Sequence, residues 1–290
     1  MICHLCPRNC GAERTEERSG GFCRQGLLPV AAKAMLHQWE EPCLVGVRGA
    51  GTVFFSGCNL RCCFCQNQSI SQGAVGKSVT PERLREIFGE LIGQGAACLD
   101  LVTPTQFTHV ILEALGEEEW PVPVVWNCGG YEKPETLRLL EGKVQVYLPD
   151  LKYALSGPAR AYSAAEDYFA WASAAIGEMF RQTGPYRMEK GLLRSGVLIR
   201  HLILPGELEN TRRCIDWVAE TFRPGEVLFS LMSQYTPQPG AEGKLARRVT
   251  KGEYRAAVEY MENCGITDGF TQERTSAKEE YTPTFDLAGI

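Results

Sequence analysis

Residues 57–67 read GCNLRCCFCQN and directly follow an apolar run, GTVFFS, at residues 51–56. The run predicts a strand, so the cysteines lie on the loop that leaves its carboxyl end. Within the loop, Cys58, Cys62 and Cys65 have the spacing C-x3-C-x2-C. Three thiolates on one tight loop can hold three irons of a cubane cluster and leave the fourth iron without a protein ligand.

Zinc is the rival occupant of this loop. A structural zinc ion takes four ligands, and the neighbouring Gln66 or Asn67 would be a poor fourth one. The spacing therefore favours an iron–sulfur cluster over zinc or a chance arrangement. The additional cysteine, Cys63, is expected to face the core.

The chain on either side of this loop alternates between short apolar runs and helical patterns. Six runs predict strands, at residues 51–56, 98–103, 122–127, 144–149, 196–204 and 226–232. Helical patterns occupy residues 80–95, 107–116, 133–142, 159–184, 210–222 and 251–265. Near-continuous apolar strands are typical of parallel sheets that are covered on both faces.

Strand–helix repeats with right-handed crossovers predict an α/β fold, here a partial (β/α)6 barrel. Six strands are too few to close the usual eight-stranded barrel. A doubly wound open sheet is the structural alternative. In both folds ligands bind at the carboxyl ends of the strands, where the cysteine loop begins.

The composition is that of a globular protein, with 44% hydrophobic and 22% charged residues in a chain of 290. The net charge of -5 argues against a nucleic-acid partner or an anionic membrane surface. We find no signal peptide pattern and no run long enough to span a bilayer. A cytoplasmic location is therefore expected, and thiols stay reduced there. In that compartment, clustered cysteines indicate metal ligands.

A second group of cysteines lies in the first two dozen residues: Cys3, Cys6, Cys10 and Cys23. Their spacing, C-x2-C-x3-C-x12-C, can close a tetrahedral site that stabilises a segment too small to have its own core. Zinc and an auxiliary iron–sulfur cluster both suit four thiolates, and free or oxidised thiols are the alternative. We expect residues 1–45 to form a small metal-binding module and residues 46–290 the barrel domain.

The central loop resembles the signature of the radical S-adenosylmethionine superfamily, in which an aromatic residue, here Phe64, precedes the last cysteine. In that superfamily the amino and carboxylate groups of S-adenosylmethionine chelate the open iron of a [4Fe-4S] cluster. One electron then cleaves the sulfonium to give methionine and a 5′-deoxyadenosyl radical, which abstracts a hydrogen from the substrate. The resemblance implies an enzyme in which the cofactors supply the chemistry and the protein supplies orientation and a dry cavity.

The stretches WNCGGY and VQVYLPDLKY, at residues 126–131 and 144–153, are similar to a paired motif in the activating enzymes of glycyl-radical proteins, such as the pyruvate formate-lyase activase. That resemblance implies a protein or peptide substrate and a low-potential electron donor such as flavodoxin or ferredoxin. That resemblance places Asn127, Cys128, Asp150 and Lys152 on the cofactor side. Phe64 and Asn67 of the cysteine loop are also expected there, and His201 is a further candidate because of its position on the fifth strand.

The chain departs from the activases at two places. Their second strand ends in Gly-Gly-Glu, which receives the cofactor amine, whereas residues 101–109 read LVTPTQFTH. Thr103, Thr105 or a backbone carbonyl is the expected substitute. Asn127 also replaces an aspartate at a monovalent-cation position, which does not favour a bound cation. On the fifth strand, either Arg200 or His201 must face the barrel interior because side chains alternate.

Two other functions fit parts of the pattern. A non-catalytic iron–sulfur electron carrier or metal sensor would explain the cysteines, but not an iron left open for a small molecule. A radical S-adenosylmethionine enzyme that modifies RNA is disfavoured by the acidic composition.

Overall fold

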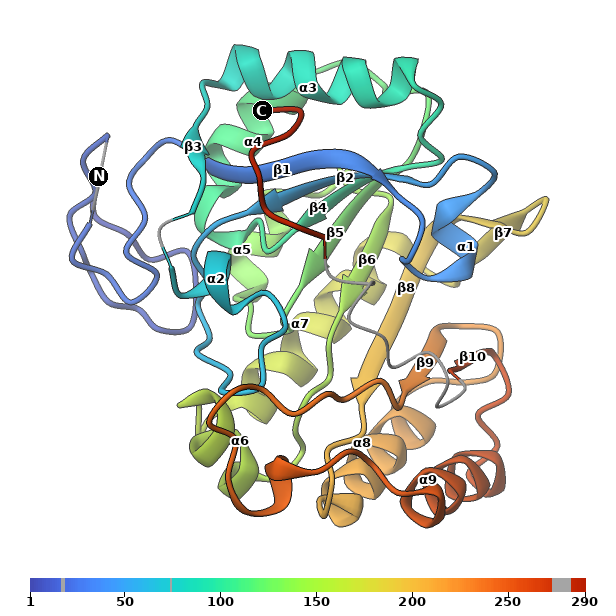
Figure 1. Cartoon of the computed structure of the whole chain (residues 1–290). Coiled ribbons are helices and arrows are strands. Elements are labelled where there is room, and N and C mark those ends of the chain that lie inside the picture. Colours follow the sequence, from blue (N-terminus) through green and yellow to red (C-terminus); the bar gives the residue numbers. More distant parts are fainter. Residues whose placement is uncertain (17–18, 74, 273–282) are drawn as a thin grey trace.

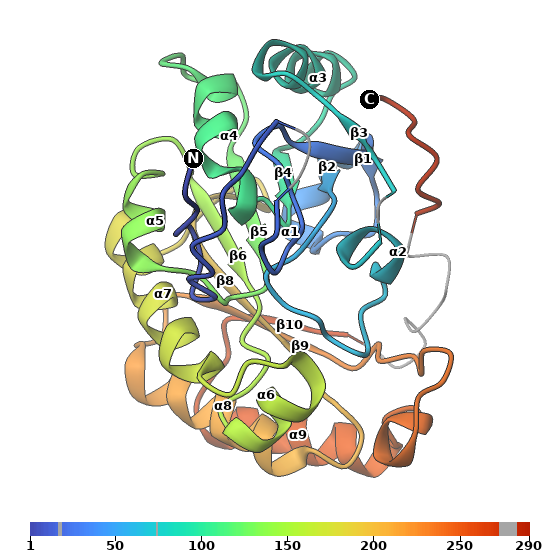
Figure 2. The ribbon, with the colours of Figure 1, turned by 90° about the vertical axis from the view of Figure 1, so that its left-hand side faces the viewer.

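The computed structural model describes residues 1–16, 19–73, 75–272 and 283–290. A mixed ten-stranded sheet forms its centre, with the strand order β10-β9-β8-β6-β5-β4-β2-β1-β3 and with β7 paired to β8. The sheet curves so that helices cover its convex face (Figures 1 and 2).

All six predicted strands are present and form the parallel part of the sheet. They are β2 (Ala50–Phe55), β4 (Leu99–Val102), β5 (Val124–Cys128), β6 (Val146–Pro149), β8 (Leu192–Leu202) and β9 (Leu228–Met232). Each pairs in parallel with the next in that order. A further short parallel strand, β10 (Gly269–Thr271), extends the sheet beyond β9.

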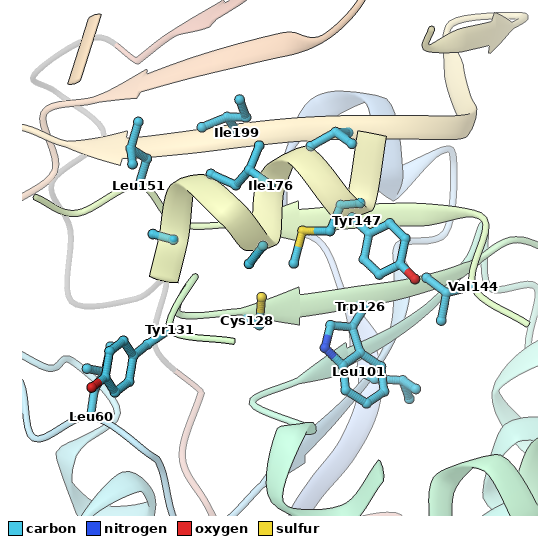
Figure 3. Close-up of a cluster of buried hydrophobic side chains, with 14 of the residues drawn as sticks. Leu60, Leu101, Trp126, Cys128, Tyr131, Val144, Tyr147, Leu151, Ile176 and Ile199 are labelled. Carbon is cyan, nitrogen blue, oxygen red and sulfur yellow. The ribbon is translucent and has the colours of Figure 1, made fainter. Parts of the chain in front are cut away.

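Side chains of the parallel strands alternate between two apolar layers. The outer layer packs against the helices and includes Trp126, Tyr147 and Ile199 (Figure 3). The inner layer lies inside the curve of the sheet and includes Val125 and Leu198. The period of two thus puts neighbouring residues of each strand into different environments.

Helices form the outer layer: α3 (Pro81–Gly93), α4 (Thr108–Leu115), α5 (Pro134–Arg138), α6 (Ser156–Ser163), α7 (Tyr168–Thr183), α8 (Leu208–Thr221) and α9 (Lys251–Asn263). The first begins as predicted, because the Thr80 side chain accepts a hydrogen bond from the Arg83 backbone N–H and Pro81 occupies the first turn. Shorter turns are α1 (Pro42–Val45), α2 (Gln68–Ser71), η1 (Thr105–Phe107) and η2 (Gly243–Ala246).

The single helix predicted over residues 159–184 is wrong, since α6 and α7 are separate. Ala164 adopts a left-handed conformation with φ 50° and ends α6. The break lets Tyr168 enter the core, where its hydroxyl donates to the backbone carbonyls of Gly129, at 2.9 Å, and Asp150, at 2.5 Å. The second helix therefore starts where it can close the carboxyl ends of β5 and β6.

The sheet also includes strands that the apolar pattern did not predict. β1 (Val30–His37) pairs antiparallel with β2, so the sheet takes in residues that the sequence analysis assigns to the N-terminal module. β3 (Lys77–Ser78) pairs with β1. β7 (Arg187–Glu189) forms a hairpin with β8 through Lys190 and Gly191, both at positive φ, as a tight two-residue turn requires.

Residues 283–290 run along the β1 side of the sheet (Figure 1, red). The Ala34 N–H donates to the Ala288 carbonyl at 2.9 Å, and the Leu287 N–H donates to the Ala32 carbonyl at 3.2 Å. Phe285 makes an edge contact with Phe54. Among the helices of the described part of the chain, none is both long and apolar enough for a membrane span.

Candidate functional site

The cysteine loop leaves β2 at the carboxyl edge of the parallel strands and leads into α2. Its first residue, Gly57, has φ 78°, and a side chain there would meet Gln25, whose Cγ lies 2.4 Å from the position of a Cβ. A glycine is therefore needed where the loop passes the N-terminal segment. In Figure 2 that segment, in dark blue, lies across the same end of the sheet.

Each of the three predicted ligand sulfurs accepts a hydrogen bond. The Leu60 backbone N–H donates to Cys58 Sγ at 3.3 Å. The Ser163 hydroxyl donates to Cys62 Sγ at 2.9 Å, and the Ser71 hydroxyl donates to Cys65 Sγ at 3.3 Å. Donors aimed at sulfur stabilise thiolate ligands, so the surroundings fit an iron–sulfur cluster.

Without a metal, two of the predicted ligand thiols, Cys58 and Cys62, have pKa values above that of a free cysteine. Burial raises the pKa of Cys62 to about 11, although the nearby Lys152 ammonium acts in the opposite direction. Burial and the adjacent Cys62 also raise the pKa of Cys58. In the described residues, no group of three or more histidine, cysteine, aspartate or glutamate side chains is already placed to hold a metal ion. The ligand assignment therefore stays a prediction.

The remaining residues of the loop have distinct positions. Cys63 is exposed, so the expectation that it faces the core is wrong; its backbone N–H bonds the Tyr162 carbonyl and so directs this residue outward. Phe64 is buried and packs edge-on against Tyr235, with ring centroids 6.3 Å apart. The Asn67 carbonyl accepts from the first turn of α2.

A buried ionic network crosses the interior of the curved sheet. Its centre is Arg200 on β8, which donates to Asp150 at 2.9 Å, to Glu40 at 3.1 Å and to the Asn127 side-chain carbonyl at 2.7 Å. Asn127 in turn donates to Glu40 at 3.0 Å and to Asp100 at 3.1 Å. Thus one guanidinium joins β5, β8, the residue after β6 and the loop before α1, and Asn127 extends the network to β4.

The two aspartates of this network have opposite protonation preferences. Burial would raise the pKa of Asp150, but Arg200 and Lys152 hold it below its ordinary value. Burial and the Glu40 carboxylate raise the pKa of Asp100 to about 8. Asp150 is therefore held in its ionised form, whereas Asp100 takes up a proton more readily than an ordinary aspartate.

Lys152 lies at the edge of this network toward the cysteine loop. Its ammonium is 2.5 Å from Asp150 Oδ2, and its side chain is 18% exposed. Its charge also acts on the Cys62 sulfur. Lys152 thus places a cation between the network and the cysteines, as a site for anionic groups requires.

His201 and Cys128 lie on the outer, helix-facing side of their strands. The two ring nitrogens of His201 lie 2.6 Å from the Leu151 carbonyl and 3.0 Å from the Thr211 hydroxyl on α8. Arg200, not His201, therefore faces the interior, and the cofactor contact expected of His201 has no support in this geometry. The Cys128 side chain lies in the outer apolar cluster (Figure 3).

The carboxyl end of β4, where the activases carry a glutamate, has an unusual backbone. Thr103 has φ 60°, a conformation that β-branched residues avoid. The Gln106 amide donates to the carbonyls of Thr103 and Gly57, at 2.8 and 3.0 Å. The Thr105 hydroxyl donates to Glu132 at 2.6 Å, and burial raises the pKa of this carboxyl group to about 8.

Sequence reasoning missed Glu40 and Glu132. Neither belongs to a motif, and Glu40 lies in the loop between β1 and α1, far along the chain from its partners. The only signal for Glu132 is its place two residues after the glycines of WNCGGY.

A groove with a volume of about 900 Å³ lies between the N-terminal segment and the chain after the cysteine loop. Its lining includes Gly20, Gly21, Arg61, Gly73 and Gly76. A smaller pocket of about 120 Å³ shares Arg61 and Gly73 with it and is lined by both Cys23 and Cys58. The groove therefore leads to the cysteine loop.

Comparisons with known proteins agree with this arrangement. Residues 45–132 match a family model described as a 4Fe-4S single cluster domain. The uncharacterized protein MJ0674 of Methanocaldococcus jannaschii is 30% identical over 276 residues, which cover 91% of this chain and 75% of that protein.

Two solved structures of Streptococcus suis SuiB share the fold. The structure of SuiB bound to S-adenosylmethionine matches with a TM-score of 0.50 and 12% identity over 79% of this chain. A second structure of SuiB matches with a TM-score of 0.50 and 13% identity over 77% of this chain. The chain spans about half the length of SuiB, 52% and 48% in the two matches. The partial-barrel α/β fold predicted from the sequence is thereby confirmed.

Proposed function

The chain belongs to the family of the uncharacterized protein MJ0674, and from this premise we propose that it is a radical S-adenosylmethionine enzyme with a [4Fe-4S] site on Cys58, Cys62 and Cys65. The observation that carries the proposal is the hydrogen-bond donor supplied to each of these three sulfurs. The match of residues 45–132 to a 4Fe-4S single cluster domain supports it.

The cluster, when bound, supplies the electron that cleaves the sulfonium of S-adenosylmethionine and so generates a radical for hydrogen abstraction. The chain's own contribution is to hold the thiolates, to orient the small molecule and to exclude water. Ser163 and Ser71 keep two of the sulfurs in place through their hydroxyl groups.

Lys152 is the proposed contact for the carboxylate of S-adenosylmethionine. Its ammonium lies beside both Asp150 and the Cys62 sulfur, and its side chain retains some exposure. Arg200, in contrast, is engaged by Asp150, Glu40 and Asn127 and serves as a positioning residue for Lys152 through Asp150. Phe64, packed on Tyr235, would fix the loop between two of its cysteines.

The substrate is proposed to be a protein or peptide, with electrons delivered by a low-potential donor such as flavodoxin or ferredoxin. The groove of about 900 Å³ supports a peptide because several of its lining residues are glycines, which let another backbone approach closely. Its continuity with the pocket beside Cys58 would bring a bound segment toward the cluster loop.

The test is reductive cleavage of S-adenosylmethionine. Anaerobically reconstituted protein, reduced and mixed with S-adenosylmethionine, is expected to release 5′-deoxyadenosine, and Cys58→Ala should abolish the product. Cys63→Ala is the matched control, since this exposed thiol on the same loop should be dispensable. Equal product from wild type and Cys58→Ala would refute the proposal, as would loss of product in Cys63→Ala with iron content unchanged.

A further inference from the structure

We propose that Cys3, Cys6, Cys10 and Cys23 bind a single divalent metal ion, of the zinc type, in a tetrathiolate site distinct from the barrel cysteines. The proposal goes beyond the radical chemistry proposed above and does not depend on it. It rests on a shared cavity, on the turns that carry the thiols and on a buried arginine that forms no ion pair with a carboxylate of the described residues.

The four cysteines line one cavity beneath the N-terminal segment. Its volume is about 10 Å³, which is the room of roughly one water molecule. A single ion fits such a space as it stands, whereas the eight-atom core of a cubane cluster would need the pocket to widen. The thiols are not yet in coordination geometry, so binding of an ion must draw the four sulfurs together. Coupling of this kind is usual where metal binding completes the folding of a small segment.

The chain turns sharply after the second cysteine in the way a metal-binding turn requires. The Asn9 backbone N–H donates to the Cys6 carbonyl at 3.0 Å. Asn9 and Gly11 both have positive φ and reverse the chain around Cys10.

Close packing brings the chain before the fourth cysteine, Cys23, against the third cysteine, Cys10. A Cβ at Gly21 would lie 3.1 Å from Cys10 Sγ, so the chain just before Cys23 passes directly over the Cys10 thiol. Immediately after Cys23, Arg24 adopts φ 59° and its N–H donates to the Gly21 carbonyl at 3.0 Å.

Arg14 supplies the second, independent observation. Its side chain is buried at 3% exposure, lines the cavity and donates to Cys23 Sγ at 3.3 Å and to the Gln106 carbonyl. Its Nε has no hydrogen-bond partner, and within the described ranges no carboxylate forms an ion pair with it. A buried cation without a counter-charge is costly. Four thiolates around a divalent ion carry a net negative charge and would supply the missing counter-charge.

The site would also hold the N-terminal segment against the barrel. Arg8, which follows Cys6 in the turn, donates to the Asn59 carbonyl at 2.8 Å and to the Ser163 carbonyl at 3.1 Å. Its guanidinium lies 3.9 Å from the centre of the Phe22 ring, next to Cys23. Asn59 follows Cys58, and Ser163 bonds Cys62, so a fixed Arg8 would steady the barrel loop.

The experiment uses the full chain with Cys58, Cys62 and Cys65 all changed to alanine, so the barrel site cannot contribute. After purification and dialysis, elemental analysis is expected to give about one zinc ion per chain. Addition of Cys6→Ser and Cys23→Ser should remove it, whereas Cys264→Ser, a half-buried cysteine at the end of α9, should not. Cobalt exchanged into the site should give the absorption of a tetrahedral thiolate complex.

Two results would overturn the proposal. One is a barrel-cysteine variant that folds, by circular dichroism, yet contains no metal and gives no thiolate–cobalt absorption. The other is iron with acid-labile sulfide in place of zinc, which would mean an auxiliary cluster. Neither result affects the proposed radical chemistry, because the variant tested lacks the barrel ligands.

Discussion

Removal of the guanidinium at the centre of the barrel, by Arg200→Leu, should strongly destabilise the fold. The side chain is 14% exposed, and it neutralises Asp150 and Glu40, which are 17% and 11% exposed. Loss of one partner of a buried ion pair costs about 3–5 kcal/mol, because the remaining charge is left uncompensated. Lys152 still faces Asp150, so the uncompensated charge is mainly that of Glu40, and we expect a loss in the lower half of that range.

The assay is urea denaturation near pH 7 and again near pH 3, below the ordinary pKa of an aspartate. Arg200 and Lys152 hold the folded-state pKa of Asp150 below its unfolded value, so this stabilisation is present above the unfolded pKa and is lost as pH falls. The gap between wild type and variant should therefore narrow at the lower pH. Arg181→Leu is the control, since Arg181 also bonds two carboxylates but is itself half exposed on α7, as is its partner Glu141; only Glu178 is buried.

Two results would refute this reasoning. One is a loss of stability in Arg200→Leu no larger than in Arg181→Leu. The other is a gap between wild type and variant that is the same near pH 3 as near pH 7.

Asp100→Asn should flatten the pH dependence of stability. The folded-state pKa of Asp100, about 8, lies above its unfolded value, so wild type loses stability as pH rises from about 4 through 8. A urea midpoint that declines equally in both proteins over this range would contradict the prediction. Ser163→Ala removes the hydroxyl that donates to Cys62 and should lower the reduction potential of a bound cluster by about 40 mV, the equivalent of one hydrogen bond of about 1 kcal/mol. The potential is measured in a redox titration followed by electron paramagnetic resonance. An unchanged potential would exclude this bond as a ligand contact. Thr80→Ala at α3 and Thr250→Ala at α9 should each lower the free energy of unfolding by about 1 kcal/mol, because each hydroxyl accepts a hydrogen bond from a backbone N–H in the first turn of its helix. An unchanged urea midpoint in both variants would show that these caps do not contribute.

The sequence was sufficient to predict the parallel strands, because buried parallel strands leave continuous apolar runs. It could not divide the helical stretch at Ala164, since alanine at a left-handed φ carries none of the glycine or proline signals that mark helix ends. It also could not assign β1 to the sheet, because the strand follows the cysteine segment directly and pairs with β2 through a reversal of the chain.

The candidate site was predictable where one motif holds several residues, as in the cysteine loop. The choice between Arg200 and His201 depends on which face of β8 is inward, and that is set by pairing with β6 and β9. Glu40 reaches the network only because β1 runs antiparallel to β2, so that the loop after His37 begins beside the start of β2 and brings Glu40 to Arg200. No local pattern records such a contact.

The backbone of Thr103, at the carboxyl end of β4, is strained. A branched side chain at φ 60° costs of the order of 1–3 kcal/mol relative to a relaxed backbone, and the hydrogen bonds of Gln106 keep it there. Selection of variants for thermal stability alone should therefore favour glycine at position 103, because glycine adopts this backbone conformation without strain. The glycine variants would be more stable to heat, but the backbone at this edge of the site would be less rigid.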